Sequence, residues 1–262
     1  MPLDIDRHAN LESPLARWDP RVKIFSLTLF IFCVALLKTI PMSLVALACA
    51  LIIMALSRLP VGFIAHGIKW VCLFLLPFLI VMPLSYPGDP AFHILGLPFA
   101  WEGLRLAVSM IIKAIAIVGT AYAMFGTSRF DVSMIALQRL KCPKILVQML
   151  LFTYRYLFVF LAEMQRMDTA MAARGFVRRA DYKTLKITGD FVGTLLVRSF
   201  ERTERIYKAM LSKGYTGEFH TLLTFQANRT DFIKAALVSG CAITLIVSDY
   251  AGFFHIAEQG WY

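Results

Sequence analysis

The sequence predicts an all-α integral membrane protein with about five transmembrane helices and a cytoplasmic region of about three helices. Of its 262 residues 58% are hydrophobic and only 17% are charged, and the mean hydropathy of +0.66 is too high for a soluble domain of this length. The apolar residues gather in five runs of roughly the length that crosses a bilayer. Lys and Arg residues flank these runs, so the formal charge of +10 does not indicate nucleic-acid binding.

The N-terminal segment, residues 1–21, is expected in the cytoplasm. It mixes acidic and basic residues and lacks the basic-then-apolar order of a secretory signal, so we expect the first apolar run to be retained as a span over 22–38. Asp19 and Pro20 mark the start of this helix. The carboxylate is a favoured N-cap, and a proline at the first helical position loses no hydrogen bond.

Three more spans are expected over 42–57, 68–85 and 103–126, so that residues 22–126 hold four transmembrane helices. The short turn at 38–41 makes the first two spans antiparallel neighbours, and residues 57–67 return the chain to the membrane. Pro77 and Pro83 lie inside the third span and predict kinks. Residues 85–102 contain three prolines and neither Lys nor Arg, which is typical of an outside loop.

Residues 127–230 are expected as cytoplasmic or interfacial helices near 130–141, 144–175 and 185–213. Most of the Lys and Arg residues, 18 of 27, lie in 127–234, and the positive-inside rule therefore places this region and the N-terminus in the cytoplasm. The apolar stretch 145–160 is an alternative sixth span. We favour a helix along the inner face, because a span would put Arg155 near mid-membrane at a cost of roughly 2.5–3.5 kcal/mol.

Residues 231–262 complete the prediction with the last transmembrane helix, over 231–254, and an external tail. Five spans with an inside N-terminus place residues 255–262 outside, where the terminal aromatic residues suit the membrane interface. The whole pattern predicts a multi-pass protein of the cell inner (cytoplasmic) membrane.

An internal repeat lies at the ends of two of the cytoplasmic helices. With an offset of 39 residues, 166–176 aligns with 205–215, and four of the eleven positions are identical. Each copy ends in a small residue, a base, a glycine and an aromatic residue. One such end is explained by helix stability alone, since a base favours the helix dipole and glycine adopts the left-handed cap. Two copies on adjacent helices predict docking to a twofold partner.

The repeat resembles the two Ala-Arg-Gly signatures that the transmembrane coupling (T) components of energy-coupling factor transporters carry at the ends of long coupling helices. The first copy matches fully, and the second keeps the small residue and the charge but replaces arginine by lysine. Residues 202–210 resemble the CbiQ-type cobalt or nickel systems. The residues that the resemblance assigns to ATPase docking are Ala173, Arg174, Gly175, Ser212, Lys213 and Gly214.

The resemblance implies a non-catalytic subunit of an ATP-driven importer. Two cytoplasmic ABC-type ATPase subunits would hydrolyse ATP-Mg, and a separate membrane substrate-binding (S) subunit would capture the solute, cobalt or nickel by subtype. This chain is then expected to bind no cofactor and no metal of its own. Two alternatives are a T component of a vitamin importer and a non-transport membrane scaffold that recruits a cytoplasmic protein.

Few other residues are candidates for chemistry. The five histidines are isolated, the five cysteines form no metal-binding or disulfide pattern, and no phosphate-binding G-x-x-x-x-G-K-[ST] loop occurs. Lys113 lies near the middle of the fourth span, where its ammonium must face protein, face a polar cavity or reach the interface. The candidate partner-contact residues are Phe176, Tyr215, Arg155 and Lys113.

Overall fold

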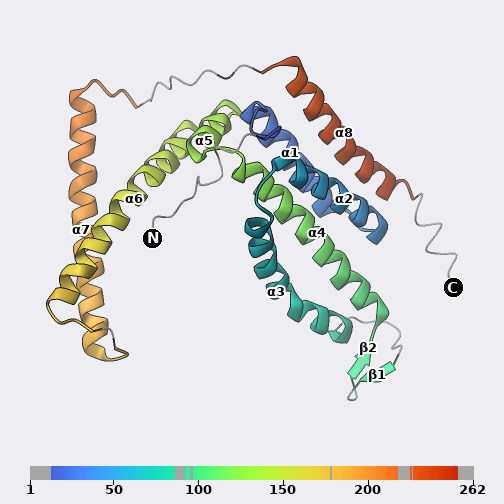
Figure 1. Ribbon diagram of the computed structural model, residues 1–262, viewed down its shortest axis with the longest axis horizontal. Coiled ribbons are helices and arrows are strands. Elements are labelled where there is room, and N and C mark those ends of the chain that lie inside the picture. Colours follow the sequence, from blue (N-terminus) through green and yellow to red (C-terminus); the bar gives the residue numbers. More distant parts are fainter. Residues whose placement is uncertain are drawn as a thin grey trace. The chain divides into compact units, whose positions relative to one another are not determined.

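The computed structural model describes residues 13–85, 92–94, 97–177, 179–217, 225 and 227–252 (Figure 1). The first twelve residues and the expected external tail lie outside this part of the chain. The described residues form helices joined by short connections, and one two-stranded hairpin. In chain order the elements are α1 (Pro20–Leu36), α2 (Ile40–Ser57), α3 (Val61–Ser85), β1 (Phe92–Ile94), β2 (Leu97–Phe99), α4 (Trp101–Gly126), α5 (Phe130–Arg139), α6 (Lys144–Ala173), α7 (Tyr182–Ser212) and α8 (Arg229–Tyr250).

The chain divides into two compact units. The bundle unit comprises the described residues of Ile5–Leu137 and Phe225–Tyr262, and the two-helix unit comprises those of Gln138–Thr224. The bundle unit therefore contains α5 besides α1 to α4 and α8, because residues such as Ile135 and Ala136 of α5 are buried. The three helices predicted near 130–141, 144–175 and 185–213 are present as α5, α6 and α7, and of these α6 and α7 form a unit of their own.

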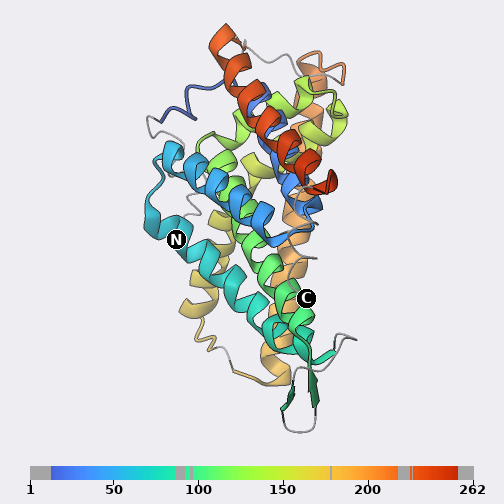
Figure 2. The same cartoon turned by 90° about the vertical axis from the view of Figure 1, so that its right-hand side faces the viewer.

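The core of the bundle unit forms around α1, which packs against α4 and α8, while α4 also packs against α2 and α3 (Figure 2). Leu27 and Phe30 of α1 are almost completely buried. The helices around α1 contribute small residues to this core, such as Ala50 of α2, Ala116 of α4 and Ala242 of α8, none of which has measurable exposure. Small residues let helix backbones approach closely, which is how helices associate where lipid removes the hydrophobic driving force.

Within the described residues, five helices are long and apolar enough to cross a membrane: α2, α3, α4, α6 and α8. These include the predicted spans over 42–57, 68–85, 103–126 and 231–254. The predicted first span, α1, has 17 residues and is therefore shorter than these five. Helix α6 also has the length and composition of a span. Both the predicted helix along the inner face and the alternative sixth span agree with these two properties.

Two features of the bundle unit differ from the prediction. Helix α3 begins at Val61, earlier than the predicted span at residue 68. Gly62 and Gly67 therefore lie inside the helix and not in the connection before it. A Cβ atom at Gly67 would overlap the ring of Tyr122, so this glycine allows α3 and α4 to pack closely. The expected outside loop contains the antiparallel strands β1 and β2, which the sequence analysis did not predict. Pro77 and Pro83 lie inside α3, as expected, and the helix bends along its length (Figure 1).

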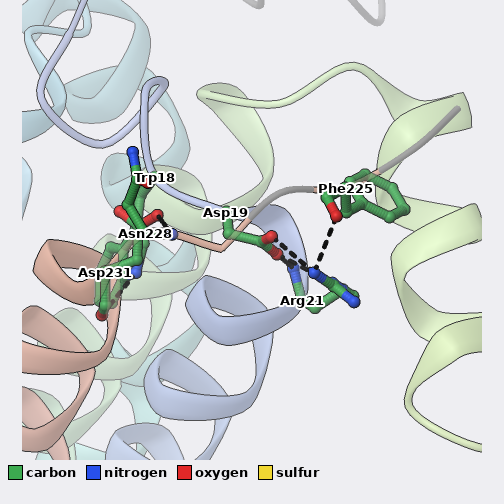
Figure 3. A network of polar contacts seen from close by, with 6 residues as sticks. All are labelled: Trp18, Asp19, Arg21, Phe225, Asn228 and Asp231. Atoms are coloured by element: carbon green, nitrogen blue, oxygen red, sulfur yellow. Dashed lines mark hydrogen bonds and ion pairs between the residues drawn. The ribbon is translucent and has the colours of Figure 1, made fainter.

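Hydrogen bonds connect the residues at the start of α1 with those at and before the start of α8 (Figure 3). Asp19 caps α1 by accepting a hydrogen bond from the backbone N–H of Arg21, as its position before Pro20 predicts. The Arg21 guanidinium binds both oxygens of Asp19, donates to the carbonyl of Phe225 and lies 5.3 Å from the centre of the Phe225 ring. The Trp18 indole N–H donates to the carbonyl of Asp231 at 3.2 Å. The chain thus re-enters the bundle unit at a fixed point.

Candidate docking site

Both copies of the repeat fold into the same glycine-terminated helix cap. Helix α6 ends at Ala173, and beyond it Gly175 has a left-handed φ of 78°. The backbone N–H of Gly175 donates to the carbonyl of Ala172 at 3.0 Å, and that of Phe176 donates to the carbonyl of Met171 at 3.1 Å. These two bonds satisfy carbonyls that the helix end would otherwise leave unpaired.

The end of α7 repeats this geometry 39 residues later. Gly214 has a φ of 81°, and its N–H donates to the carbonyl of Leu211 at 3.0 Å. The N–H of Tyr215 donates to the carbonyl of Met210 at 3.0 Å. The base that precedes each glycine, Arg174 or Lys213, closes its helix with nearly the same backbone angles. The repeat in the sequence is therefore a repeat in backbone conformation.

The side chains of the two caps also share a pattern of exposure. Arg174, Lys213 and both glycines are exposed, whereas Phe176 and Tyr215 are half-buried. Neither base has an ion-pair partner among the described residues, although Lys208, on the turn before Lys213, is paired with Glu204 at 2.7 Å. A Cβ atom added to Gly175 or Gly214 would meet no atom within 4 Å. Each cap thus presents a cation beside an open stretch of backbone.

The two caps differ in what the aromatic residue contacts. Phe176 lies in a hollow of about 500 Å³ that also includes Met171, Asp181 and Ile187. Tyr215 instead donates its hydroxyl hydrogen to the side-chain oxygen of Gln148 at 3.2 Å. The nitrogen of the same Gln148 side chain donates to the carbonyl of Gly217. The second cap is therefore bound to the first turn and a half of α6, a contact that the sequence analysis missed although Gln148 is a polar interruption of an apolar run.

These contacts make α6 and α7 an antiparallel pair with its caps at opposite ends (Figure 1). Helix α7 starts at an N-cap, Asp181, only a few residues beyond the first cap, and its own cap lies near the start of α6. Thirty-one residues at 1.5 Å each give α7 a length of roughly 46 Å. The two basic ends are therefore separated by about the length of one helix.

A groove runs between the two helices of this unit. Its apolar part, about 410 Å³, is lined on α6 by Met149, Phe152, Tyr156 and Phe160, and on α7 by Ile206 and Met210. Arg198 of α7 pairs across the groove with Glu163 of α6. The apolar stretch 145–160 thus presents aromatic side chains towards α7, while other apolar side chains of its first turn are exposed, with Ile145 66% and Leu146 49% accessible.

The two remaining candidate partner-contact residues lie in different settings. Arg155 is exposed in the middle of α6, and no hydrogen bond or ion pair is found for it among the described residues. Lys113 is half-buried in α4, and its ammonium donates to the carbonyl of Leu37, at the end of α1. Asp249 binds the neighbouring backbone N–H groups of Lys38 and Thr39. Lys113 therefore faces protein within the bundle unit, the first of the three options that its position allowed.

The described residues contain no group of three or more His, Cys, Asp or Glu side chains that could hold a metal ion. Near the first cap, the side chain of Asp181 has a shifted pKa. Hydrogen bonds from the side chain and the backbone N–H of Thr184 hold the pKa of Asp181 below its ordinary value, so it is ionised at neutral pH. Its carboxylate caps α7.

The fold and this site together define a class of protein, a polytopic helical membrane protein with an additional pair of long helices that end in duplicated basic caps. A family model described as cobalt transport protein, CbiQ, matches residues 12–222. The chain belongs to this CbiQ family of cobalt transport proteins. The resemblance inferred from the two signatures is confirmed.

Individual relatives support the same assignment. The chain is 26% identical to the energy-coupling factor transporter transmembrane protein EcfT of Heliobacterium modesticaldum, over 82% of this chain and 85% of the relative. It is 27% identical to the cobalt transport protein CbiQ of Rhodobacter capsulatus, over 57% and 59% of the two chains. An uncharacterised protein of Methanocaldococcus jannaschii is 27% identical over 81% of this chain and 75% of its own length.

Proposed function

We propose that this chain is the transmembrane coupling component of an ATP-driven energy-coupling factor importer that takes up cobalt or nickel ions. In this proposal Arg174 and Lys213 insert into acidic grooves on two ATPase subunits, and the apolar stretch 145–160 holds the substrate-binding subunit. ATP hydrolysis takes place on the ATPases. The observation that supports the proposal best is the identical cap geometry at the ends of α6 and α7.

The distance between the caps supports a partner with two separate receptor sites. Because α6 and α7 are antiparallel, the two bases are separated by roughly 40 Å, which is the scale of a small domain. One small protein groove cannot receive both ends. Two copies of one ATPase can, each presenting the same groove to one cap. Movement of the two ATPases towards each other would then tilt α6 against α7.

The two contacts are expected to differ in strength. Arginine offers a carboxylate two parallel hydrogen bonds, whereas lysine offers a point charge. A hydrogen bond to a charged group contributes about 1.5–3 kcal/mol, and we place the Arg174 contact at the upper end of this range and the Lys213 contact at the lower end. The first cap is then the stronger attachment.

The solute is assigned to the metals from the names of the family and of the Rhodobacter capsulatus relative. Relatives named only as energy-coupling factor transporter proteins leave a vitamin as the alternative solute. A membrane scaffold that recruits a cytoplasmic protein without transport is the alternative from another class. Stimulated ATP hydrolysis after reconstitution with the partner subunits contradicts the scaffold.

The double variant Arg174→Ala with Lys213→Ala tests the docking. We expect it to lose co-purification of the ATPases and uptake of radiolabelled cobalt, while the membrane subunit itself still folds, because both side chains are exposed and make no internal ion pair among the described residues. The conservative variant Lys213→Arg should retain or strengthen assembly.

The matched control is Arg166→Ala with Arg205→Ala, which removes the same charge from equivalent exposed positions of the repeat, two turns before each cap. Equal loss of assembly in both double variants would show that net charge and not the caps binds the ATPases. Unchanged co-purification in the cap variant would contradict the proposal. Uptake of a vitamin and not of cobalt by the intact complex would replace the solute assignment alone.

A further inference from the structure

The aromatic residues of the two caps differ by one polar atom, the hydroxyl oxygen of Tyr215 that Phe176 lacks. This hydroxyl donates to the side-chain oxygen of Gln148 at 3.2 Å. The side-chain nitrogen of Gln148 donates to the carbonyl of Gly217, also at 3.2 Å. We call these two hydrogen bonds the Gln148 bridge. They use a feature of the second cap that the first cap does not have.

Both bonds of the Gln148 bridge require the same orientation of the amide. Its oxygen accepts from a hydroxyl group and its nitrogen donates to a carbonyl, so rotating the amide by half a turn would break both bonds. Gln148 and Tyr215 are half-buried, and Val147, next to Gln148, is the one buried residue of α6. Gly217 has a left-handed φ of 96°, which glycine adopts without strain.

The bridge joins the two helix ends of this unit that are not consecutive in the chain. At the opposite end of the pair, residues 174–181 connect α6 directly to α7. Next to the bridge, a hollow of about 410 Å³ lies between the helices, and Met149 and Met210 belong to its lining. Gln148 therefore connects the end of α7 to the start of α6 beside a gap in their packing.

The backbone of the second cap does not depend on the bridge. Its hydrogen bonds run from the N–H groups of Gly214 and Tyr215 to carbonyls of α7 itself. The bridge uses the Tyr215 hydroxyl and a carbonyl beyond the cap. Loss of the bridge should therefore leave Lys213 presented for docking, and it should change how the end of α7 is held to α6.

We propose that Gln148 is a positioning residue that makes the start of α6 follow the second cap, an inference that rests on the proposed docking of Lys213 to an ATPase. When the ATPase displaces this cap, the bridge transmits the displacement to α6, and the end of α7 does not simply separate from it. Residues 140–143 join the start of α6 to α5 of the bundle unit. The displacement thus continues along the chain into the membrane part.

Transport per ATP hydrolysed tests this role in proteoliposomes that contain the full chain, both ATPases and the substrate-binding subunit. Gln148→Met keeps the length of the side chain and removes both hydrogen bonds, whereas Tyr215→Phe removes one. A neutral hydrogen bond changes an equilibrium by about two- to tenfold, so we expect radiolabelled cobalt uptake per ATP to fall about tenfold in Gln148→Met and about threefold in Tyr215→Phe. The ATPases should co-purify undiminished with both variants.

The combined variant, Gln148→Met with Tyr215→Phe, shows whether the two residues act through one contact. It should transport as Gln148→Met alone does, because the hydroxyl acts through the Gln148 amide. The matched controls are Gln165→Met on α6 and Tyr182→Phe on α7, which make the same changes at exposed positions outside the bridge. Both controls should keep the transport per ATP of the unmodified complex.

Three results would overturn the role of Gln148. The first is equal transport per ATP by Gln148→Met and Gln165→Met. The second is a combined variant whose loss is the product of the two single losses, which would mean that the residues act independently. The third is loss of ATPase co-purification by Gln148→Met, which would make Gln148 a part of the docking site or of the fold. Failure of the docking proposal itself is recognised separately, by ATPases that still co-purify with Arg174→Ala and Lys213→Ala combined.

Discussion

The bundle unit and the two-helix unit bury their side chains to very different extents. Seven residues of the short helix α1 are buried, whereas Val147 is the one buried residue of α6 and α7 has none. Long helices gain most of their stability from burying an apolar face against a partner. The bundle unit provides such a partner for each of its helices. The two-helix unit presents large exposed apolar side chains, such as Leu185, Leu196 and Phe200, that other subunits could cover.

The charged residues of the two units show the same contrast. In the bundle unit the ammonium of Lys23 is completely buried and donates to Thr127 and Ser128, and Asp19 is bound by Arg21. In the two-helix unit Arg174 and Lys213 extend from the helix ends into open space. The bundle unit thus buries charged groups that bind its own helices, whereas the two cap bases of the two-helix unit are exposed. Changes of equal chemistry should therefore have unequal effects in the two units.

The largest difference is expected for phenylalanine-to-alanine changes. Phe30→Ala in α1 removes a side chain that is 1% exposed and leaves a cavity of roughly 100 Å³, which should destabilise the bundle unit by about 3–5 kcal/mol. Phe200→Ala in α7 removes a side chain that is 72% exposed and should change stability by less than about 0.5 kcal/mol in the isolated chain. Denaturation in detergent, followed by circular dichroism, measures both. Comparable losses in the two variants would contradict the contrast between the units.

Smaller changes in helix stability are expected for two glycine-to-alanine variants within the two-helix unit, and the two changes should have opposite signs. Gly175→Ala forces a Cβ atom into the left-handed cap and should destabilise the end of α6 by about 1–2 kcal/mol. Gly189→Ala lies inside α7, where a Cβ atom meets nothing within 4 Å, and should stabilise that helix by about 0.5–1 kcal/mol.

Amide hydrogen exchange at the last turn of α6 and in the middle of α7 measures the two effects. Faster exchange in the first variant and slower exchange in the second are expected. If Gly175→Ala left the protection of α6 unchanged, the cap would not depend on glycine.

The helices of this protein could be predicted largely from local signals. Asp19 before Pro20 located the start of α1, and the repeated glycines located the ends of α6 and α7 within one or two residues. The start of α3 could not be predicted in this way, because glycine lowers the stability of a helix by about 0.5–1 kcal/mol, and the close contact of Gly67 with Tyr122 comes from a helix that is distant in the sequence. Local patterns do not contain that information.

The candidate site could also be predicted only in its local features. Residues and spacing of the caps were evident from the repeat, and the family assignment confirms the resemblance. The contact between Tyr215 and Gln148 was not evident, because it depends on α6 and α7 being antiparallel.

The smallest effect is expected for the aspartates that cap one helix in each unit. Burial alone would raise the pKa of Asp19, but its hydrogen bonds to Arg21 and the positive charge there outweigh burial, so the pKa lies below the ordinary 3.8. The pKa of the exposed Asp181 is also lowered, by Thr184 and by the nearby Lys183. A lowered pKa in the folded state means that each cap stabilises its helix above pH 3.8 and that this contribution is lost as the pH falls through the lower value.

Acidification should therefore loosen both caps only below about pH 3.8, and Asp19 should resist longer because Arg21 binds both of its oxygens. The backbone amide signals of Arg21 and Thr184, which these carboxylates bind, report the two titrations by NMR in detergent. Asp181→Asn, which can cap without charge, should abolish the titration at Thr184 and leave that at Arg21 unchanged. A midpoint at or above 3.8 at either amide would mean that the cap is not formed in solution. At Thr184 this result would show that the first turn of α7 is not held by its N-cap, in keeping with the few buried side chains of the two-helix unit.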